Sequence, residues 1–396
     1  MKIKILFEKL SKIKIKIFII IFSKICIMNN GNLFEPLKTE FYKIKKDNLS
    51  IISFNKMFNS YIKPKSILIF EPFDYHHECS PGFTKYFIDM GYNVDLLICF
   101  SGLYSFSLFK HMEKIRFIIF NNLKQINNNA QNLGEFIKKY EYVLIQTTKE
   151  PNFKLYNKIG FFNLNSSIFI QHKSDIFNKT IFISYFKNNR IWSIGNNTKA
   201  LFVNPHYFGD IKIKPKNNKT RFFLTSTDQR NYALLLESSQ RLKNENFEFE
   251  LIVTGRSKRL NSKTIPKNLS DIFIFKIHTP YNELYKAIEN SDYIIIPLDP
   301  KSRNDELYKK DIVSGSFQLV YGFIKPALVH EEFACFQHLD NQNSLIYNNN
   351  NFYNIMKKAI LLKNKEYENL QENIRILAKE IYLESIRNIR KSINAL

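Results

Sequence analysis

Short runs of consecutive apolar residues recur along the chain and are separated by polar loops and amphipathic segments. A continuous apolar run a few residues long is typical of a strand that is buried on both faces. Helices are expected between several of these runs, most clearly at 82–90 and 132–140. Strands that alternate with helices predict a parallel sheet covered by helices on both faces. In the first half we expect strands at 66–71, 93–100, 116–120, 142–146, 167–171 and 200–203.

The same alternation continues in the second half, after a polar and basic stretch at 209–220 that contains Pro215 and is interpreted as a linker. Expected helices lie at 231–243, 281–290 and 313–322, and residues 352–392 carry the apolar periodicity of one or two amphipathic helices. Expected strands lie at 221–225, 248–254, 272–277, 293–297, 326–330 and 344–347.

A chain of 396 residues is too long for one ordinary core. The predicted fold class is α/β, with two Rossmann-like domains that face each other across a cleft, followed by C-terminal helices. We place the first domain at 60–208, the second at 220–350 and the C-terminal helices at 352–396. Ligands of such sheets bind outside the carboxyl ends of the strands, so functional residues are expected just after each strand.

Residues 1–28 form a basic and apolar segment with seven lysines and one glutamate. Its apolar part is interrupted by Lys16 and Lys24 and is shorter than the ~20 clean residues of a spanning helix. Three interpretations stay open: a signal-like segment without a small-residue cleavage site, a segment lying on an anionic membrane face, or a start upstream of the true start at Met28. The remaining sequence has no spanning segment, which predicts a cytoplasmic protein that is at most peripheral at the inner membrane face.

The chain has a formal net charge of +22, which favours an anionic partner. Nucleic acid, an anionic membrane surface and a phosphorylated small molecule all fit this charge. No RRM, KH, zinc-finger or helix-turn-helix signature is present, so we expect no nucleic-acid partner. The four cysteines, Cys26, Cys79, Cys99 and Cys335, have neither zinc-site nor disulfide spacing. With no DxD-type motif either, we expect no required metal and no cofactor.

Two motifs in the second half carry a family resemblance. Residues 281–285 read Tyr-Asn-Glu-Leu-Tyr, and residues 290–297 read Asn-Ser-Asp-Tyr-Ile-Ile-Ile-Pro, followed by a Ser/Gly turn, a helix and Lys325-Pro326. This order is similar to the nucleotide-sugar domain of GT-B glycosyltransferases, in particular the retaining group 1 type. The family usually has two glutamates seven residues apart. Here Gln318 or Leu319 stands where the ribose-binding glutamate is expected, and an amide can still accept a ribose hydroxyl.

The candidate donor site follows the strands of the second half. Ser314, Gly315 and Ser316 open a helix whose N-terminal N–H groups suit a diphosphate, although Ser314 could simply be a helix cap. Arg230 and Arg256 follow strands, and their guanidinium groups could clamp phosphate and stabilise a departing nucleoside diphosphate. Solvated surface charge is the alternative for both. The full predicted donor set is Ser226, Thr227, Arg230, Arg256, Asp299, Ser314, Gly315, Ser316 and Gln318.

The candidate acceptor side lies in the loop after the first strand. His76 is predicted to bind the acceptor, and His77 and Glu78 are predicted catalytic groups, because His and Glu at a strand end can act as general bases. The family resemblance implies a histidine that faces the donor sugar from the end of a mid-domain strand, and His172 is assigned to that role. A polar surface loop is the alternative for all of these residues.

The resemblance implies a hexosyltransferase that moves a sugar from a nucleotide-sugar donor to a saccharide or lipid-linked acceptor, in the biosynthesis of cell-surface polysaccharide. The nucleotide-sugar would be a substrate, and an anionic membrane surface a further partner. Two alternatives remain open: a nucleotide-sugar epimerase of the same fold, and a degenerate GT-B module that binds without catalysis.

Overall fold

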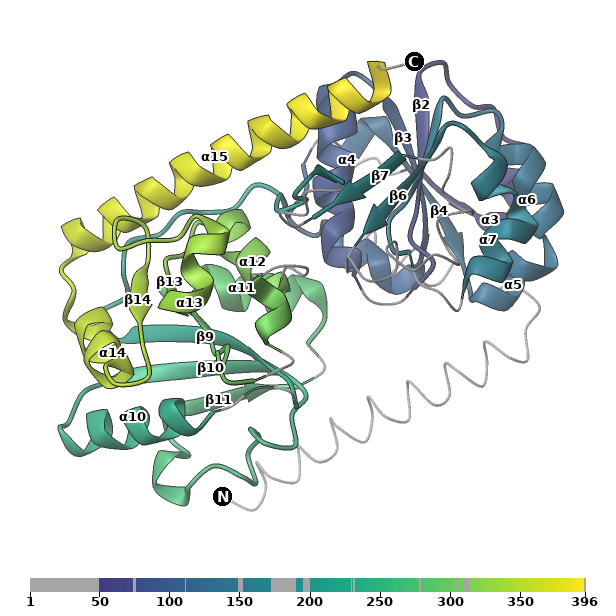
Figure 1. The fold of residues 1–396 in the computed structure, drawn as a ribbon. Helices are drawn as coiled ribbons and strands as arrows, with labels where there is room; N and C mark the ends of the chain where they lie inside the picture. Colours follow the sequence, from purple (N-terminus) through teal and green to yellow (C-terminus); the bar gives the residue numbers. More distant parts are fainter. Residues whose placement is uncertain are drawn as a thin grey trace.

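The computed structural model describes residues 50–73, 76–110, 112–148, 152–171, 190–194, 200–228, 230, 232–277, 279–302, 305–309 and 314–394. Two α/β bodies lie side by side, and a long C-terminal helix crosses both (Figure 1). His172 and residues 1–28 lie outside the described residues. Among the helices of the described part, none has both the length and the apolar character that crossing a bilayer requires.

The described residues of the first body form a parallel sheet in the order β1-β4-β3-β2-β5-β6-β7-β8. Without the two edge strands, this is the doubly wound order of a Rossmann fold. The strands are β1 (Ser50–Ser53), β2 (Ser66–Phe70), β3 (Asn93–Cys99), β4 (Ile115–Phe120), β5 (Tyr142–Ile145), β6 (Ser167–Gln171), β7 (Arg190–Ser193) and β8 (Leu201–Phe202). The helices are α3 (Phe54–Met57), α4 (Ser80–Asp89), α5 (Leu123–Asn128), α6 (Ala130–Ile137) and α7 (Phe153–Ile159), with 3₁₀ turns η1 (His77–Cys79) and η2 (Phe100–Phe106).

The second body repeats this order among its described residues, as β11-β10-β9-β12-β13-β14, again all parallel. Its strands are β9 (Thr220–Ser226), β10 (Phe249–Gly255), β11 (Phe273–Lys276), β12 (Tyr293–Ile296), β13 (Ala327–His330) and β14 (Leu345–Tyr347). Its helices are α10 (Ala233–Asn244), α11 (Tyr281–Glu289), α12 (Gly315–Phe323), α13 (Glu331–Ala334) and α14 (Phe352–Leu361).

The continuous apolar runs are explained by burial on both faces of each sheet. In β2, Ile67 and Ile69 join the core that includes side chains of α4, whereas Leu68 and Phe70 join the core under α5, α6 and α7. Successive residues of a strand point to opposite faces, so each run supplies two cores at once. The second sheet is divided in the same way between α11 and α12 on one face and α10 and α14 on the other.

The predicted α/β class with two Rossmann-like domains is confirmed, but the apolar pattern does not predict β1 or β7. Strand β1 lies at the sheet edge and buries fully only Ile51, so it carries no apolar run. Strand β7 reads Arg-Ile-Trp-Ser, in which the apolar run is only two residues long. Both strands are held by pairing with their neighbours more than by a pattern of their own.

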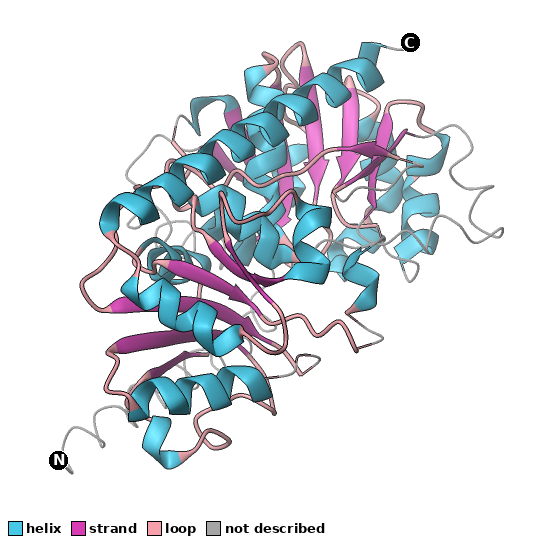
Figure 2. Ribbon diagram, turned by 60° about the vertical axis from the view of Figure 1, so that its left-hand side comes forward, coloured by secondary structure: helices cyan, strands magenta, loops and turns pink. Residues whose placement is uncertain are grey.

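The last helix, α15 (Asn364–Asn394), connects the two bodies a second time. Figure 2 shows it running across both. Ile374 and Ile381 pack in a core of the second body, whereas Ile389 and Ile393 belong to a core of the first. The indole N–H of Trp192 in β7 donates to Ser392 Oγ over 3.0 Å. The chain therefore returns to its first domain before it ends.

Candidate functional site

The two bodies meet where loops from the carboxyl edges of their sheets come together. Turn η1 follows β2 and contacts the first turn of α11 and the N-terminal part of α12. Tyr281 Oη donates to Glu78 Oε2 over 2.9 Å, and Cys79 Sγ donates to Gln318 Oε1 over 3.6 Å. Both contacts join residues from different domains. The predicted acceptor side and the predicted donor helix are thus adjacent in the structure.

On the acceptor side, His76 and Glu78 form a pair. His76 has a positive φ of 67°, and its carbonyl accepts a hydrogen bond of 2.6 Å from Gln146 Nε2. Its Nδ1 lies 3.4 Å from Glu78 Oε1. Burial alone would raise the pKa of Glu78, but the hydrogen bond and charge of His76, with help from Tyr281, lower this pKa to about 2. Glu78 is therefore ionised at neutral pH and can orient the imidazole.

His77 lies elsewhere, although it is adjacent in sequence. Its side chain is fully buried, and its Nε2 lies 3.4 Å from Cys99 Sγ. A Cβ on Gly102 would approach the His77 ring to 2.8 Å, so the imidazole packs directly against η2. The predicted roles of His76, His77 and Glu78 stay predictions, but the structure separates them into an interdomain pair and an interior residue.

Sequence reasoning missed Glu71, the residue that follows β2. Its side chain is fully buried, with Oε1 accepting from the Phe73 amide over 2.9 Å and Oε2 accepting from Thr147 Oγ1 over 2.6 Å. Burial raises the pKa of Glu71 well above its ordinary value, the charge of Glu78 adds to the rise, and the two hydrogen bonds offset only part of it. A carboxyl group with a raised pKa and one with a lowered pKa thus lie near one loop, a pattern common at functional sites. The sequence signal that could have found Glu71 is its position directly after a predicted strand, where functional residues are expected.

The buried Glu71 gives the protein a defined pH dependence. In the unfolded chain Glu71 ionises near its ordinary pKa of 4.5, whereas in the fold it stays protonated to higher pH. Its contribution to stability is complete below pH 4.5 and is lost as pH rises toward the folded pKa, by up to about 1.4 kcal/mol per pH unit. We expect Glu71→Gln, which stays neutral, to gain stability relative to the parent between pH 5 and 8, measured by urea unfolding.

A matched control is Glu135→Gln, because the Glu135 side chain is 71% exposed. This substitution should change stability by less than about 0.5 kcal/mol across the same pH range. A loss of stability at pH 8 in Glu71→Gln would show that Glu71 is ionised and paired in the fold.

On the donor side, Ser314 caps α12, with its Oγ accepting from the Ser316 amide over 3.4 Å, and a Cβ on Gly315 would meet no atom of the described residues within 4 Å. Gln318, one turn further, is only 2% exposed, and among the described residues its Nε2 has no hydrogen-bond partner. The Ser316 and Phe317 N–H groups are both paired with Ser314, so the end of this nine-residue helix offers mainly its partial positive charge, beside the buried Gln318 amide at the same interface.

The other predicted donor residues do not all converge on that helix. Arg230 is buried in an ion pair with Asp305, and its guanidinium lies 4.7 Å from the Tyr308 ring centre. Asp299 donates its backbone N–H to Asp305 over 2.9 Å. The charge of Arg230 is therefore already neutralised within the second domain.

Arg256 and the end of β9 form a separate group. Arg256 is exposed just beyond β10, after Gly255, which has a φ of +86°. Ser226 is buried and donates to the Thr254 carbonyl over 2.9 Å, so its hydroxyl joins β9 to β10. Thr227 Oγ1, next along the chain, is buried and has no partner within the described residues. In the part of the chain that the structure describes, no three His, Cys, Asp or Glu side chains cluster in a way that could hold a metal ion.

Comparison with known proteins identifies the fold. No family model and no curated protein matches the chain. A glycosyltransferase from Rickettsia africae has a TM-score of 0.54 and 14% identity, with 84% of this chain and 99% of that chain covered. The Anabaena protein Alr3699/HepE, solved in complex with UDP-glucose, has a TM-score of 0.51 and 11% identity, with 84% and 100% covered. At these identities the likeness shows the fold alone, the GT-B architecture that the sequence predicts.

Proposed function

We propose that this chain is a glycosyltransferase that moves a sugar from a nucleotide-sugar donor to a hydroxyl of a saccharide or lipid-linked acceptor, in the synthesis of cell-surface glycans. The observation that carries the proposal is that η1, beside the His76–Glu78 pair, contacts α11 through Tyr281 and the first turn of α12 through Gln318, across the domain interface. A histidine–carboxylate pair and a helix N-terminus thus lie on opposite sides of one junction. Sugar transfer from a nucleoside diphosphate needs both.

In the proposed reaction, the acceptor hydroxyl gives its proton to His76 Nε2 while its oxygen forms a bond to the anomeric carbon. The bond between that carbon and the diphosphate oxygen breaks, and the electron pair leaves with the nucleoside diphosphate. Glu78 keeps Nδ1 of His76 protonated and stabilises the imidazolium that forms. The N-terminus of α12 and the exposed Arg256 stabilise the charge on the leaving diphosphate. The nucleotide-sugar is a substrate, and the proposal requires neither metal nor resident cofactor.

The net charge of +22 supports one further part of the proposal. A lipid-linked acceptor would bring the protein to a membrane surface, and an anionic surface attracts a strongly basic protein. We propose peripheral attachment at the cytoplasmic face of the membrane for that case.

The proposal is tested by incubating the full chain with UDP-, GDP- and ADP-sugars, and by measuring binding and the release of nucleoside diphosphate. Binding of one donor class with slow release supports the transferase. Formation of an epimeric sugar would instead support the epimerase alternative. If none of the donors binds, both enzyme assignments fail and a non-catalytic module remains.

Ser314→Ala is the variant that tests the donor helix. Loss of a cap costs about 1 kcal/mol of stability wherever it occurs. At α12 we also expect about tenfold weaker binding of the nucleoside diphosphate, measured by calorimetry, because the hydroxyl and the ordered N-terminal turn are part of the proposed phosphate site.

Asn122→Ala is the matched control, because the Asn122 side chain caps α5 by accepting from the Gln125 amide over 3.0 Å. It should lose similar stability and no nucleotide affinity. Equal nucleotide affinity in the two variants would remove α12 from the donor site.

A further inference from the structure

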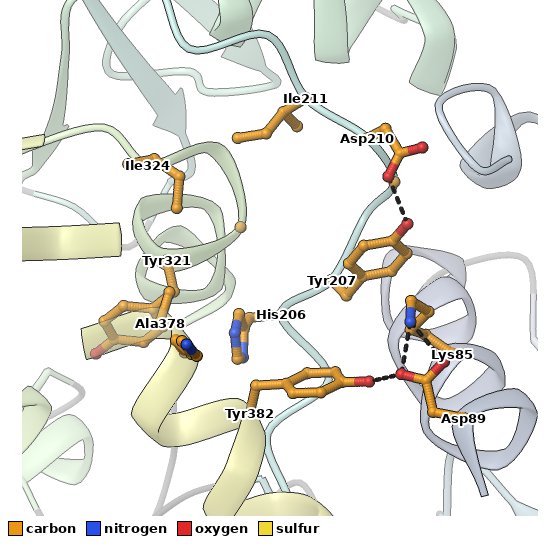
Figure 3. A pocket seen from close by; sticks show the side chains of 13 residues that line it. Lys85, Asp89, His206, Tyr207, Asp210, Ile211, Tyr321, Ile324, Ala378 and Tyr382 are labelled. Atoms are coloured by element: carbon orange, nitrogen blue, oxygen red, sulfur yellow. Dashed lines mark hydrogen bonds and ion pairs between the residues drawn. The ribbon is translucent and has the colours of Figure 1, made fainter. Parts of the chain in front are cut away.

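A hollow of about 450 Å³ lies where the two domains are joined (Figure 3). Four segments line it: α4 from the first domain, the crossing segment 206–211, the end of α12 from the second domain, and α15. We call it the hinge pocket. None of the residues that form the candidate site lines it. Its size falls within the range of about 300–1,000 Å³ that is usual for small-molecule sites.

Gly322 in the pocket lining and Gly82 in α4 let residues 205 and 206 approach the helices of both domains closely. A Cβ on Gly82 in α4 would lie 2.4 Å from the Pro205 carbonyl oxygen, and one on Gly322 in α12 would lie 2.2 Å from that of His206. The crossing segment therefore lies directly against a helix of each domain. A ligand in the pocket would contact both domains at once.

Charges in the hinge pocket are balanced. Lys85 Nζ donates to Asp89 over 2.6 Å, and Tyr382 also donates to Asp89. Tyr207 Oη donates to Asp210 over 3.1 Å, and Lys110 pairs with Asp210 from outside the pocket over 3.2 Å. Figure 3 draws the contacts of Asp89 with Lys85 and Tyr382 and the contact between Tyr207 and Asp210. The lining lysines, Lys85 and the exposed Lys379, equal the lining aspartates in number, so the lining offers no net charge to an ion.

His206 does not change this balance. It is 5% exposed, and burial lowers its pKa to about 4 in spite of hydrogen bonds to backbone carbonyls. It is therefore neutral at pH 7. A phosphate at Lys85 would have to displace Asp89, and it would lie near the carboxylates of Asp89 and Asp210, which makes a nucleotide an unfavourable occupant.

Aromatic rings supply the apolar surface. Lys85 Nζ lies 5.6 Å from the centre of the Tyr207 ring and 5.8 Å from that of Tyr382. An internal cation thus already occupies the position that an organic cation would take on these rings. Tyr321, which is in edge contact with His206 at 5.9 Å, adds a third ring to the pocket wall. The hinge pocket therefore has no net charge, and its lining combines tyrosine rings with two carboxylates and two lysine ammonium groups.

We propose that the hinge pocket binds a neutral saccharide, at a site separate from the donor and acceptor positions. Lys85 lies over both rings and Tyr382 also packs on Tyr86, so sugar C–H groups would contact the parts of the half-buried Tyr207 and Tyr382 rings that stay exposed. Sugar hydroxyls would donate to Asp89 and Asp210 and accept from Lys379. The pocket's aromatic surface with a few fixed polar groups is the usual composition of such a site. The proposal depends on the pocket's own chemistry and does not require the transfer reaction.

A functional consequence follows if the proposed transferase function holds. Helix α4 begins directly after the His76–Glu78 pair, and α12 begins at Ser314–Ser316. Both helices run from the candidate site to the hinge pocket, where they contribute Lys85 and Tyr321. A saccharide bound between them would favour one relative orientation of the domains and so change donor affinity.

The test is calorimetric titration of the full chain with maltose, cellobiose and lactose, and separately with inorganic phosphate and UDP. We expect at least one disaccharide to bind, and Tyr207→Ala to weaken that binding by about tenfold or more. Tyr207→Phe keeps the ring and should retain most of the affinity. Tyr61→Ala is the matched control, since Tyr61 is 75% exposed and does not line the pocket, and it should bind like the parent.

Three results would overturn the proposal: no binding of any of the three disaccharides, binding that Tyr207→Ala leaves unchanged, or competition by phosphate for the site that depends on Tyr207. UDP binding should be the same in Tyr207→Ala and the parent. A protein that binds disaccharide and fails to bind UDP or the other donors would refute the proposed function and leave the hinge pocket intact. Circular dichroism of each variant shows that it is folded before titration.

Discussion

His76→Asn is expected to lower the rate of sugar transfer by about 10²–10⁴-fold, the usual contribution of a positioned general base. His76 has a positive φ of 67°, a backbone conformation that asparagine tolerates and alanine does not, so this substitution removes the imidazole without straining η1. The carbonyl that accepts from Gln146 is kept. The measurement is turnover with the donor that binds, together with the affinity for the nucleoside diphosphate, which should not change.

His338→Asn is the matched control for this substitution. His338 is also a histidine with positive φ, 52°, but it is exposed at the end of a 3₁₀ turn in the second domain. It should retain full activity. If His76→Asn turns over as fast as His338→Asn, His76 is not the proton acceptor, and Glu78 would have to act alone. The hydrogen bond and charge of His76 are the main causes that lower the pKa of Glu78 to about 2, so in this variant that pKa would rise and Glu78 would become a stronger base.

The sequence could place His76 near a site because parallel sheets bind ligands at the carboxyl ends of their strands. It could not separate His76 from His77. The two residues are adjacent, and only the left-handed backbone at His76 sends one ring toward Glu78 while the other packs on η2. A sequence pattern does not specify such a local change of direction. The same limit applies to Glu71, whose place at a strand end was visible but whose complete burial was not.

Contacts between residues that are far apart in the chain could not be predicted from the sequence either. Arg230 was predicted as a phosphate clamp, and its ion pair with Asp305 joins positions 75 residues apart. Tyr281 belongs to the motif that carried the family resemblance, yet its contact with Glu78 spans 203 residues and depends on how the domains meet. The fold was easier to predict from the sequence, because long buried strands carry apolar runs. The strand prediction missed β1 and β7, where pairing within the sheet, not the residues' own pattern, determines the conformation.

Gly322→Ala is expected to destabilise the protein by about 3 kcal/mol, at the upper end of the usual cost of overpacking. In a free helix this change would be favourable by up to about 1 kcal/mol, because alanine is the better helix former. Here the added Cβ would lie 2.2 Å from the His206 carbonyl oxygen and 2.3 Å from a carbon of the Phe208 ring. The carbonyl belongs to the segment between the domains, so no side-chain rotation can relieve the contact. Urea unfolding measures the loss.

Gly315→Ala tests the same substitution at the other end of α12, where a Cβ meets no atom within 4 Å among the residues that the structure describes. Its stability should stay within about 0.5 kcal/mol of the parent. The two variants share a helix and a chemical change, and their main structural difference is what lies next to the new methyl group. If Gly322→Ala were as stable as Gly315→Ala, the crossing segment could move away from α12 at no cost. The hinge pocket, whose shape depends on that close approach, would then have no fixed geometry to recognise a ligand.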